Sequence, residues 1–243
     1  MANAPQGKGS FEFDHLINFR DLGGHPCAGG GRTRVGVLFR CGMPRNPSAR
    51  DMAKLRELGV RTVIDLRGDL EARERPSSLA RDGSVDYSQI SLLEINPATA
   101  PAAVPLLDIY KRSLEEYSAN YAAAFTKLAN ARLPAVFHCF LGKDRTGILA
   151  AMLLSLAGVG REDIVRDYSL SEEALRPFFL GEIERNTGLI WENNDEHLGS
   201  PPSNMAGLLD ELDSRWGGVE NYLLRAGVSA RNIDKAAALL CGR

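Results

Sequence analysis

The sequence predicts a single α/β domain in which a central, mostly parallel sheet is flanked by helices and followed by a helical C-terminal portion. First, a chain of 243 residues with 44% hydrophobic and 25% charged residues can bury the core of one domain. Second, residues 135–138 form a short apolar run, and a glycine-containing loop joins it to a helical pattern over residues 146–156. Third, residues 161–243 carry helical patterns almost throughout.

Apolar spacing and chain breakers predict the other elements. Residues 1–10 are expected to form a flexible tail and residues 11–243 the single domain, because no shift in composition divides the remaining chain. Glycine-rich turns between residues 18 and 42 surround a run at 35–40 that we expect to form half of a hairpin. Strands are predicted at 60–66 and 85–92, and helices at 51–58, 69–75, 106–131, 163–175, 204–216, 219–225 and 230–240.

Composition and charge argue against several classes of partner. A net charge of -2 gives no sign of a nucleic-acid partner. The longest apolar stretch, residues 148–159, is too short to cross a bilayer, and residues 1–10 lack the apolar core of a secretory signal. We therefore expect no transmembrane segment and a cytoplasmic location. The cysteines are scattered without zinc-ligand spacing, so neither a disulfide framework nor a metal site is expected; they are Cys27, Cys41, Cys139 and Cys241.

The segment from His138 to Gly147 carries the pattern most directly linked to chemistry. Five residues separate Cys139 from Arg145, which allows the chain to close a loop whose backbone N–H groups point inward. Such amides, together with the N-terminus of a following helix, bind phosphate. Arg145 can donate two N–H bonds to two phosphate oxygens. We therefore expect an anion site built locally in a nearly neutral chain.

The same positive field would stabilise Cys139 as a thiolate, because a cysteine pKa can fall from about 8.5 to roughly 3.5–7.5 in such a setting. Cys139 is expected to attack phosphorus and form a phosphocysteine that water hydrolyses. Thr146 is placed to donate its hydroxyl to the sulfur, and Gly142 to let the backbone approach the phosphate. Taken singly, each residue is more often structural. The spacing and the following Thr146-Gly147 favour function.

These residues resemble a known family. The pattern His-Cys-x5-Arg-Thr-Gly, starting at His138, is similar to the signature of protein tyrosine phosphatases. The run from Gly142 to Arg145 resembles a bacterial and fungal branch described as atypical, or lipid-active, tyrosine phosphatases. The resemblance covers most of the chain, and Cys41 departs from it, since serine is expected there. Further blocks resembling this branch are Asn18 to Gly24 with Leu38 to Arg40, Val63 to Arg67, and Gly218 to Leu223.

The resemblance implies a protein tyrosine phosphatase acting on phosphotyrosine proteins or peptides. Lys143 is a feature shared with phosphoinositide phosphatases, so phosphoinositides are a second expected substrate class. Phe140 and Leu141 beside the nucleophile should favour a flat aromatic ester. No cofactor is expected, because no acidic or histidine cluster has the spacing of a two-metal site. The expected phosphate-binding residues are Phe140, Leu141, Gly142, Lys143, Asp144 and Arg145.

The identity of the general acid is left open. Better-known tyrosine phosphatases use an aspartate in a Trp-Pro-Asp loop, and this sequence has no such tripeptide. The family implies Asp144, within the loop itself, or Asp65, at a strand end, as the proton donor. Asp65 has a structural alternative, which is local pairing with Arg67 or Arg20.

Two other functions fit part of the pattern. A rhodanese-type sulfurtransferase or an arsenate reductase also uses a cysteine loop, but a rhodanese loop need not end in Arg-Thr-Gly. A scaffold could bind phosphate without chemistry, but Cys139, Arg145 and Thr146 are all present. A phosphatase assay separates these alternatives.

Overall fold

A computed structural model describes residues 11–44, 46–94, 104–184 and 198–241. Within these residues, five short strands form one sheet in the order β1-β2-β5-β3-β4. All neighbouring strands are parallel except the antiparallel pair β1–β2, so the predicted, mostly parallel sheet is confirmed. The tail expected at residues 1–10 lies outside the described residues. The strands are β1 (Arg20–Asp21), β2 (Leu38–Cys41), β3 (Thr62–Asp65), β4 (Asp86–Gln89) and β5 (Ala135–His138).

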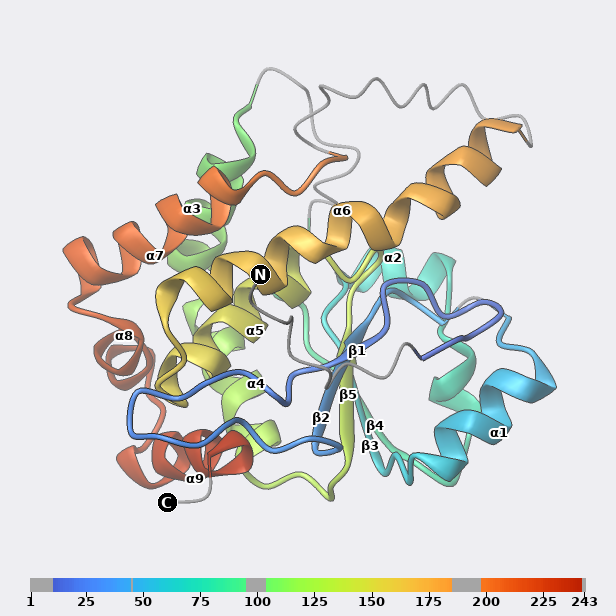
Figure 1. Cartoon of the computed structure of the whole chain (residues 1–243), viewed down its shortest axis with the longest axis horizontal. Helices are drawn as coiled ribbons and strands as arrows, with labels where there is room; N and C mark the ends of the chain where they lie inside the picture. Colours follow the sequence, from blue (N-terminus) through green and yellow to red (C-terminus); the bar gives the residue numbers. More distant parts are fainter. Residues whose placement is uncertain (1–10, 45, 95–103, 185–197, 242–243) are drawn as a thin grey trace, which may run out of the picture.

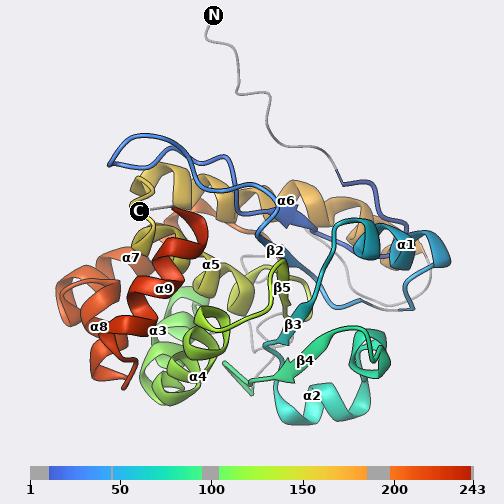
Figure 2. The same cartoon turned by 90° about the horizontal axis from the view of Figure 1, so that it is seen from below.

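Helices cover both faces of the sheet, with α1 on one side and α4, α5 and α9 on the other (Figures 1 and 2). Alternate residues of β5 supply the two cores: Ala135 and Phe137 join the larger cluster, and Val136 the smaller one. The helices of the described chain are α1 (Ala49–Glu57), α2 (Asp69–Glu74), α3 (Leu106–Glu116), α4 (Ser118–Ala129), α5 (Asp144–Leu156), α6 (Arg161–Glu184), α7 (Pro202–Trp216), α8 (Val219–Arg225) and α9 (Ala230–Leu240), with a short 3₁₀ turn at Ser78–Arg81.

The helix that follows the loop is the central helix of the larger core. Residues 144–154 of α5 are all buried, and most of them are apolar, so this helix has no solvent-facing polar stripe over that length. The helix therefore begins inside the protein, and its first N–H groups are withdrawn from water. This geometry is what a buried anion site requires.

Some element boundaries differ from the sequence-based expectation. The helix predicted at 106–131 is two helices, because Tyr117 leaves the helical region at φ -115° and ψ 24° between α3 and α4. The helix predicted at 163–175 continues to Glu184 with Pro177 inside it, although proline cannot donate the usual backbone bond. The run at 35–40 does supply one half of a hairpin, but its strand is Leu38–Cys41, paired with β1.

The cysteines correct one expectation. A disulfide joins Cys27, in the N-terminal loop, to Cys241, just after α9, across 214 residues. Cys27 and Cys241 lie far apart in the sequence, so only the fold brings them together. Cys41 and Cys139 are free and buried. Among the helices that the structure describes, none is both long and apolar enough to cross a membrane.

Candidate active site

The loop between β5 and α5 lies at the edge of the sheet where the parallel strands end. The pairing register brings Cys41, Asp65 and His138, the last residues of β2, β3 and β5, to one level. Leu66 N donates to His138 O at 2.7 Å immediately before the loop begins. Residues 139–143 are therefore held between the ends of two neighbouring strands, the position at which α/β folds bind ligands.

The carbonyl oxygens of residues 140–142 are bonded to donors outside the loop. Met43 N donates to the first carbonyl at 2.9 Å. The side-chain amide of Asn18 donates to the second and third at 3.0 Å each, and Arg40 Nη2 donates to the third at 2.8 Å. Because the C=O and N–H of a planar trans peptide point in opposite directions, the N–H groups of residues 141–143 face the loop interior. Inward amides of this kind bind anions.

Glycine at position 142 is required, for a reason other than the expected approach to phosphate. Gly142 has a φ of +69°, and a Cβ there would lie 2.3 Å from the carbonyl carbon of Cys41. The residue therefore allows the loop to pass directly against the end of β2. Gly147 allows close helix packing, because a Cβ there would lie 3.0 Å from the ring of Tyr168 on α6.

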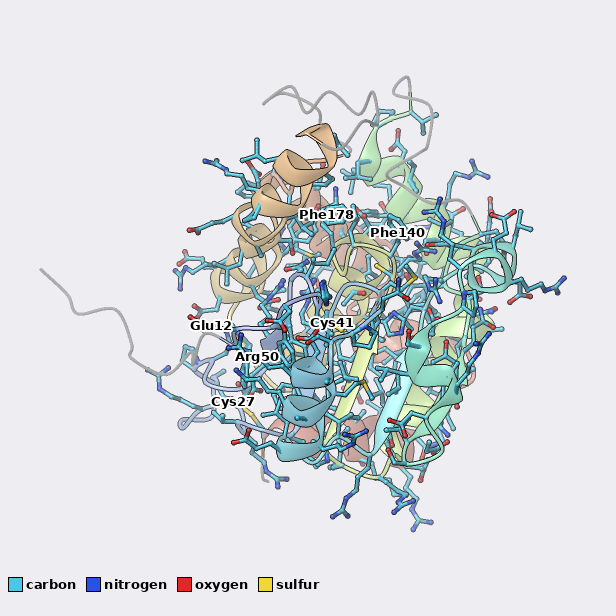
Figure 3. All side chains as sticks on the ribbon, turned by 90° about the vertical axis from the view of Figure 1, so that its right-hand side faces the viewer. Glu12, Cys27, Cys41, Arg50, Phe140 and Phe178 are labelled. Atoms are coloured by element: carbon cyan, nitrogen blue, oxygen red, sulfur yellow. A yellow bond between two sulfur atoms is a disulfide. The ribbon has the colours of Figure 1, made fainter. Side chains whose placement is uncertain are left out.

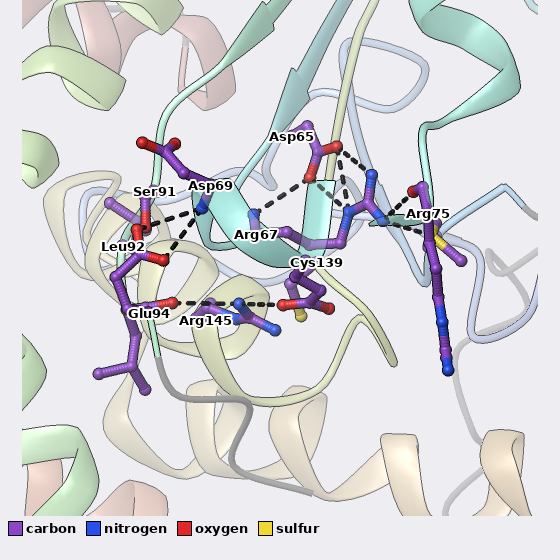
Figure 4. A network of polar contacts seen from close by, with 12 residues as sticks. Asp65, Arg67, Asp69, Arg75, Ser91, Leu92, Glu94, Cys139 and Arg145 are labelled. Atoms are coloured by element: carbon purple, nitrogen blue, oxygen red, sulfur yellow. Dashed lines mark hydrogen bonds and ion pairs between the residues drawn. The ribbon is translucent and has the colours of Figure 1, made fainter. Parts of the chain in front are cut away.

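Arg145 is buried and held by an acidic partner from α2. Its Nη1 donates to Glu71 Oε2 at 2.8 Å and to Leu93 O at 3.2 Å, and Figure 4 shows Arg145 with its contacts close to Cys139. Burial opposes protonation, but the charges of Cys139 and Glu71 raise the pKa of Arg145 above its ordinary value. Arg145 Nε is buried with no hydrogen-bond partner in the described part of the chain, so a donor is left for a phosphate oxygen.

Cys139 lies at the start of this loop and is only 1% exposed. The hydroxyl oxygen of Thr146 is buried and has no hydrogen-bond partner among the described residues. A buried hydroxyl without a partner costs free energy, which its expected donation to the Cys139 sulfur would offset. The structure thus brings the predicted nucleophile, arginine and hydroxyl to one loop and helix start.

Asp65 is committed to an internal ion pair. It is fully buried and accepts bonds from Arg67 Nη2 at 2.6 Å and from the hydroxyl of Tyr87 at 2.6 Å (Figure 4 shows the Arg67 contacts). His138 Nδ1 lies 3.8 Å from Asp65 Oδ1. Although burial opposes ionisation, His138 and Arg67 hold the pKa of Asp65 well below its ordinary value. Pairing with Arg67, the structural alternative for Asp65, is therefore observed.

Asp144, the other candidate acid, begins α5 and is 3% exposed. Its Oδ1 accepts a bond from the Tyr110 hydroxyl at 2.5 Å, and the Tyr110 hydroxyl lies 2.8 Å from that of Tyr168. Lys143 Nζ lies 3.4 Å from Asp144 Oδ1 and donates to Gly199 O at 2.7 Å. Lys143 is itself fully buried and engaged inside the protein, whereas the resemblance led us to expect it to meet a polyanionic head group.

The two bulky residues of the loop have different surroundings. Phe140 is partly buried, with the guanidinium of Arg75 5.6 Å from its ring centroid. Figure 3 shows Phe140 and Phe178 above Cys41, in the upper half of that view. Leu141 is 2% exposed and packs in a small apolar cluster with residues of α6. Phe140 is therefore better placed than Leu141 to contact a substrate ring.

Sequence reasoning missed several residues that hold this site in place. Glu71 and Tyr110 lie within the helices predicted at 69–75 and 106–131, and the helical pattern assigns neither residue a role. Asp167, on α6, accepts a bond from Arg40 Nη1 at 2.6 Å and carried no sequence signal at all. Asn18 and Arg40 belong to blocks that resemble the family, but the resemblance implies no role for them.

No three His, Cys, Asp or Glu side chains gather as metal ligands in the ranges that the structure describes. The absence of a metal requirement stays a prediction. The positive groups that face an anion are instead the loop amides, the start of α5 and Arg145.

Known proteins are similar to this chain over most of its length. A family model described as the tyrosine phosphatase family matches residues 11–242. A Cupriavidus necator protein named as a tyrosine-protein phosphatase is 32% identical, covering 91% of this chain and 85% of that protein. A tyrosine-protein phosphatase of Nostoc commune is 34% identical over 76% of this chain and 67% of that protein. The triple specificity protein phosphatase PtpB of Mycobacterium tuberculosis is 28% identical over 93% and 96%. The chain therefore belongs to the tyrosine phosphatase family.

Proposed function

We propose that this chain hydrolyses phosphotyrosine in proteins or peptides through a phosphocysteine intermediate on Cys139. The observation that carries the proposal is the pairing of a free, buried Cys139 with Arg145, whose guanidinium is fixed by Glu71 beside inward-facing loop amides. These groups supply a positive site for the three phosphoryl oxygens without a metal. Phosphoinositides are a second substrate class.

The reaction follows from these groups in two steps. The Cys139 thiolate attacks phosphorus, the S–P bond forms and the P–O bond to the tyrosyl oxygen breaks. The leaving oxygen takes a proton from the carboxyl group of Asp144. Water then attacks the phosphocysteine and gives a proton to Asp144, the S–P bond breaks, and inorganic phosphate and the Cys139 thiolate are released. Arg145 holds the equatorial oxygens in both steps, and Thr146 donates to the sulfur as it leaves.

The local structure supports phosphotyrosine as the main substrate. Cys139 is only 1% exposed, so a long aryl ester should reach its sulfur more easily than the short side chain of phosphoserine. Phe140 is the partly exposed aromatic residue beside it. The amine of Lys143 is occupied by the Gly199 carbonyl, which weakens its expected part in binding a head group. The relative PtpB is named for triple specificity, so the substrate panel has to extend beyond phosphotyrosine.

Turnover of a phosphotyrosine peptide, a phosphoserine peptide and a phosphoinositide should be compared for the wild type, Cys139→Ser and Cys41→Ser. Cys139→Ser should lose turnover by several orders of magnitude and still bind vanadate, because no base activates a serine there. Cys41→Ser is the matched control, since Cys41 is the other free and buried cysteine. Near-normal activity of Cys139→Ser would refute the mechanism, and a preference for phosphoserine would refute the substrate.

Two further expectations belong to the same proposal. Activity should survive EDTA and be blocked by vanadate or by thiol alkylation. Loss of activity in EDTA that a divalent metal restores would overturn metal independence. The domain at residues 11–243 and the cytoplasmic location, both expected from the sequence, stay predictions, which activity after deletion of residues 2–10 and cell fractionation respectively would test.

A further inference from the structure

A buried charge network lies behind the phosphate-binding loop. Asp167 of α6 is 1% exposed, and its carboxylate accepts bonds from Arg20 Nε at 3.0 Å and from Arg40 Nη1 at 2.6 Å. Arg20 Nη2 donates to the carbonyl of Asp167 at 2.9 Å and to Ser171 Oγ at 3.0 Å. The network therefore joins α6 to both β1 and β2.

The same network reaches the loop on its carbonyl side. Arg40 Nη2 donates to Gly142 O at 2.8 Å, and Asn18 Nδ2 donates to Leu141 O and Gly142 O at 3.0 Å each. Arg20 Nη1 donates to Asn18 Oδ1, which fixes the orientation of the Asn18 amide. Asn18 itself has a φ of 54°, a left-handed conformation that asparagine tolerates better than most residues.

We propose that Asn18 and Arg40, oriented by Asp167, are positioning residues that hold the phosphate-binding loop with its amides inward. The reason lies in the peptide geometry. If the peptide after Leu141 or Gly142 rotated, a carbonyl oxygen would replace an amide N–H at the anion, and an attraction would become a repulsion. Bonds to both carbonyls from outside the loop prevent that rotation. This assigns a role to the N-terminal blocks at Asn18 and Arg40 and rests on the proposed function.

The network holds two guanidinium groups, of Arg20 and Arg40, around the one carboxylate of Asp167. Burial and then Arg20 lower the pKa of Arg40 to about 10, while Asp167 raises it, so Arg40 keeps its proton at neutral pH. Although burial opposes ionisation, Arg20 and Arg40 hold the pKa of Asp167 well below its ordinary value. A charged donor makes a stronger hydrogen bond to a carbonyl than a neutral one does. Asp167 also offsets one of the two guanidinium charges behind the loop.

A purely structural role is the competing explanation, because the network also links α6 to the sheet. A measured loss of stability is expected for both a structural role and a positioning role. The pH dependence of Cys139 alkylation separates these two roles, because it reports the field that the loop amides place on the thiolate. Affinity for vanadate reports the same amides with the anion bound. Neither readout should move in a variant that is merely less stable but still folded.

The chain offers a matched control within the same block. Asp21 accepts bonds from Gly23 N at 2.7 Å and from Gly36 N at 2.6 Å, so it holds the neighbouring turn and not the phosphate-binding loop. Asp21→Asn should lower the melting temperature and leave the loop unchanged. Asn18→Gly is the test variant, because glycine adopts the same positive φ and removes only the side-chain amide. Arg40→Lys is the second variant, because lysine cannot donate to Asp167 and Gly142 O together in the geometry of a fork.

Alkylation by iodoacetate from pH 4 to 9, vanadate affinity and kcat/KM on an aryl phosphate should be measured for all four proteins. We expect Asn18→Gly and Arg40→Lys to raise the alkylation midpoint, weaken vanadate and lower kcat/KM by about 10- to 100-fold, less than the 10²–10³ lost with a direct oxyanion donor. Asp21→Asn should match the wild type in all three. Wild-type profiles for both test variants, or equal losses in Asp21→Asn, would overturn the positioning role. If Cys139 of the wild type reacts with iodoacetate as expected but the wild type does not hydrolyse the aryl phosphate, only the proposed function would be refuted.

Discussion

The general acid can be identified by comparing Asp144→Asn with Asp65→Asn, because the structure gives the two carboxylates different surroundings. Asp144 accepts one hydroxyl bond, from Tyr110, and has the Lys143 amine 3.4 Å away. An asparagine there keeps an oxygen for Tyr110 but removes the charge opposite the buried Lys143 amine, so the free energy of unfolding should fall by about 1–3 kcal/mol. Asp65 neutralises Arg67 in a fully buried pair, and breaking such a pair costs about 3–5 kcal/mol.

The effect on the catalytic rate should be the reverse of the effect on stability, with Asp144→Asn showing the larger dependence on the leaving group. A variant without the true acid should lose about 10²–10⁴-fold in kcat on phosphotyrosine, whose leaving oxygen has a pKa near 10. It should lose much less on 2,4-dinitrophenyl phosphate, whose leaving group needs no proton. We expect this pattern for Asp144→Asn, and a uniform loss on both substrates for Asp65→Asn.

The assay is kcat on the two substrates beside urea unfolding of each variant, so that loss of folded protein is not mistaken for loss of chemistry. Tyr110→Phe adds a check on orientation: it removes the hydroxyl from Asp144 and should reduce the phosphotyrosine rate more than the dinitrophenyl rate. A steep leaving-group dependence in Asp65→Asn with a flat one in Asp144→Asn would refute the reasoning and transfer the role to Asp65.

Three further predictions follow from single contacts. Glu71→Gln should lower kcat/KM on an aryl phosphate about tenfold, since it weakens a charge-assisted bond that orients the loop arginine; Glu74→Gln on the same helix is the control and should be neutral. Gly142→Ala should destabilise the fold by several kcal/mol in urea unfolding, since a positive φ and a backbone contact of 2.3 Å both oppose a Cβ; Gly83→Ala, with nothing within 4 Å, should not. Burial, opposed by the nearby carboxylate, lowers the pKa of His138 below 6.5. The unfolded chain therefore binds a proton that the folded chain does not, and stability should fall as pH drops below about 6.5, by up to about 1.4 kcal/mol per unit. Urea unfolding from pH 7.5 to 5 measures this, and a His138→Asn variant with an unchanged slope would contradict it.

The strand, loop and first helix of the site could be predicted because their signals are local. The strand at Ala135–His138 has the predicted bounds, as do the helices at Val219–Arg225 and Ala230–Leu240. Short apolar runs between breakers, and apolar residues at helical spacing, depend on burial and not on a particular partner. The Cys139-to-Arg145 spacing likewise fixes a loop whatever surrounds it.

The partners of the site could not be predicted because each is set by tertiary contact. Glu71 meets Arg145 across 74 residues, and Asp167 meets Arg40 across 127. In sequence, an acidic residue on a helix looks the same whether it faces water or a buried guanidinium. The helix break at Tyr117 could not be predicted for a related reason: apolar residues keep their helical spacing on both sides of it.

A nearly neutral chain can still build a positive site, because each buried arginine is paired with a carboxylate that keeps the arginine charged and fixed in place. Of the described residues, the buried arginines are Arg40, Arg67 and Arg145, and their carboxylate partners are Asp167, Asp65 and Glu71. A buried guanidinium without such a partner would be costly, so each pair keeps its arginine charged and fixed. The three pairs differ in how many N–H donors of the arginine are left without a hydrogen-bond partner. Arg67 uses Nε, Nη1 and Nη2 inside the protein, whereas Arg40 and Arg145 each keep an Nε without a hydrogen-bond partner among the described residues. Of these two arginines, Arg145 follows the nucleophile's loop, so the net charge of the chain says little about where an anion binds.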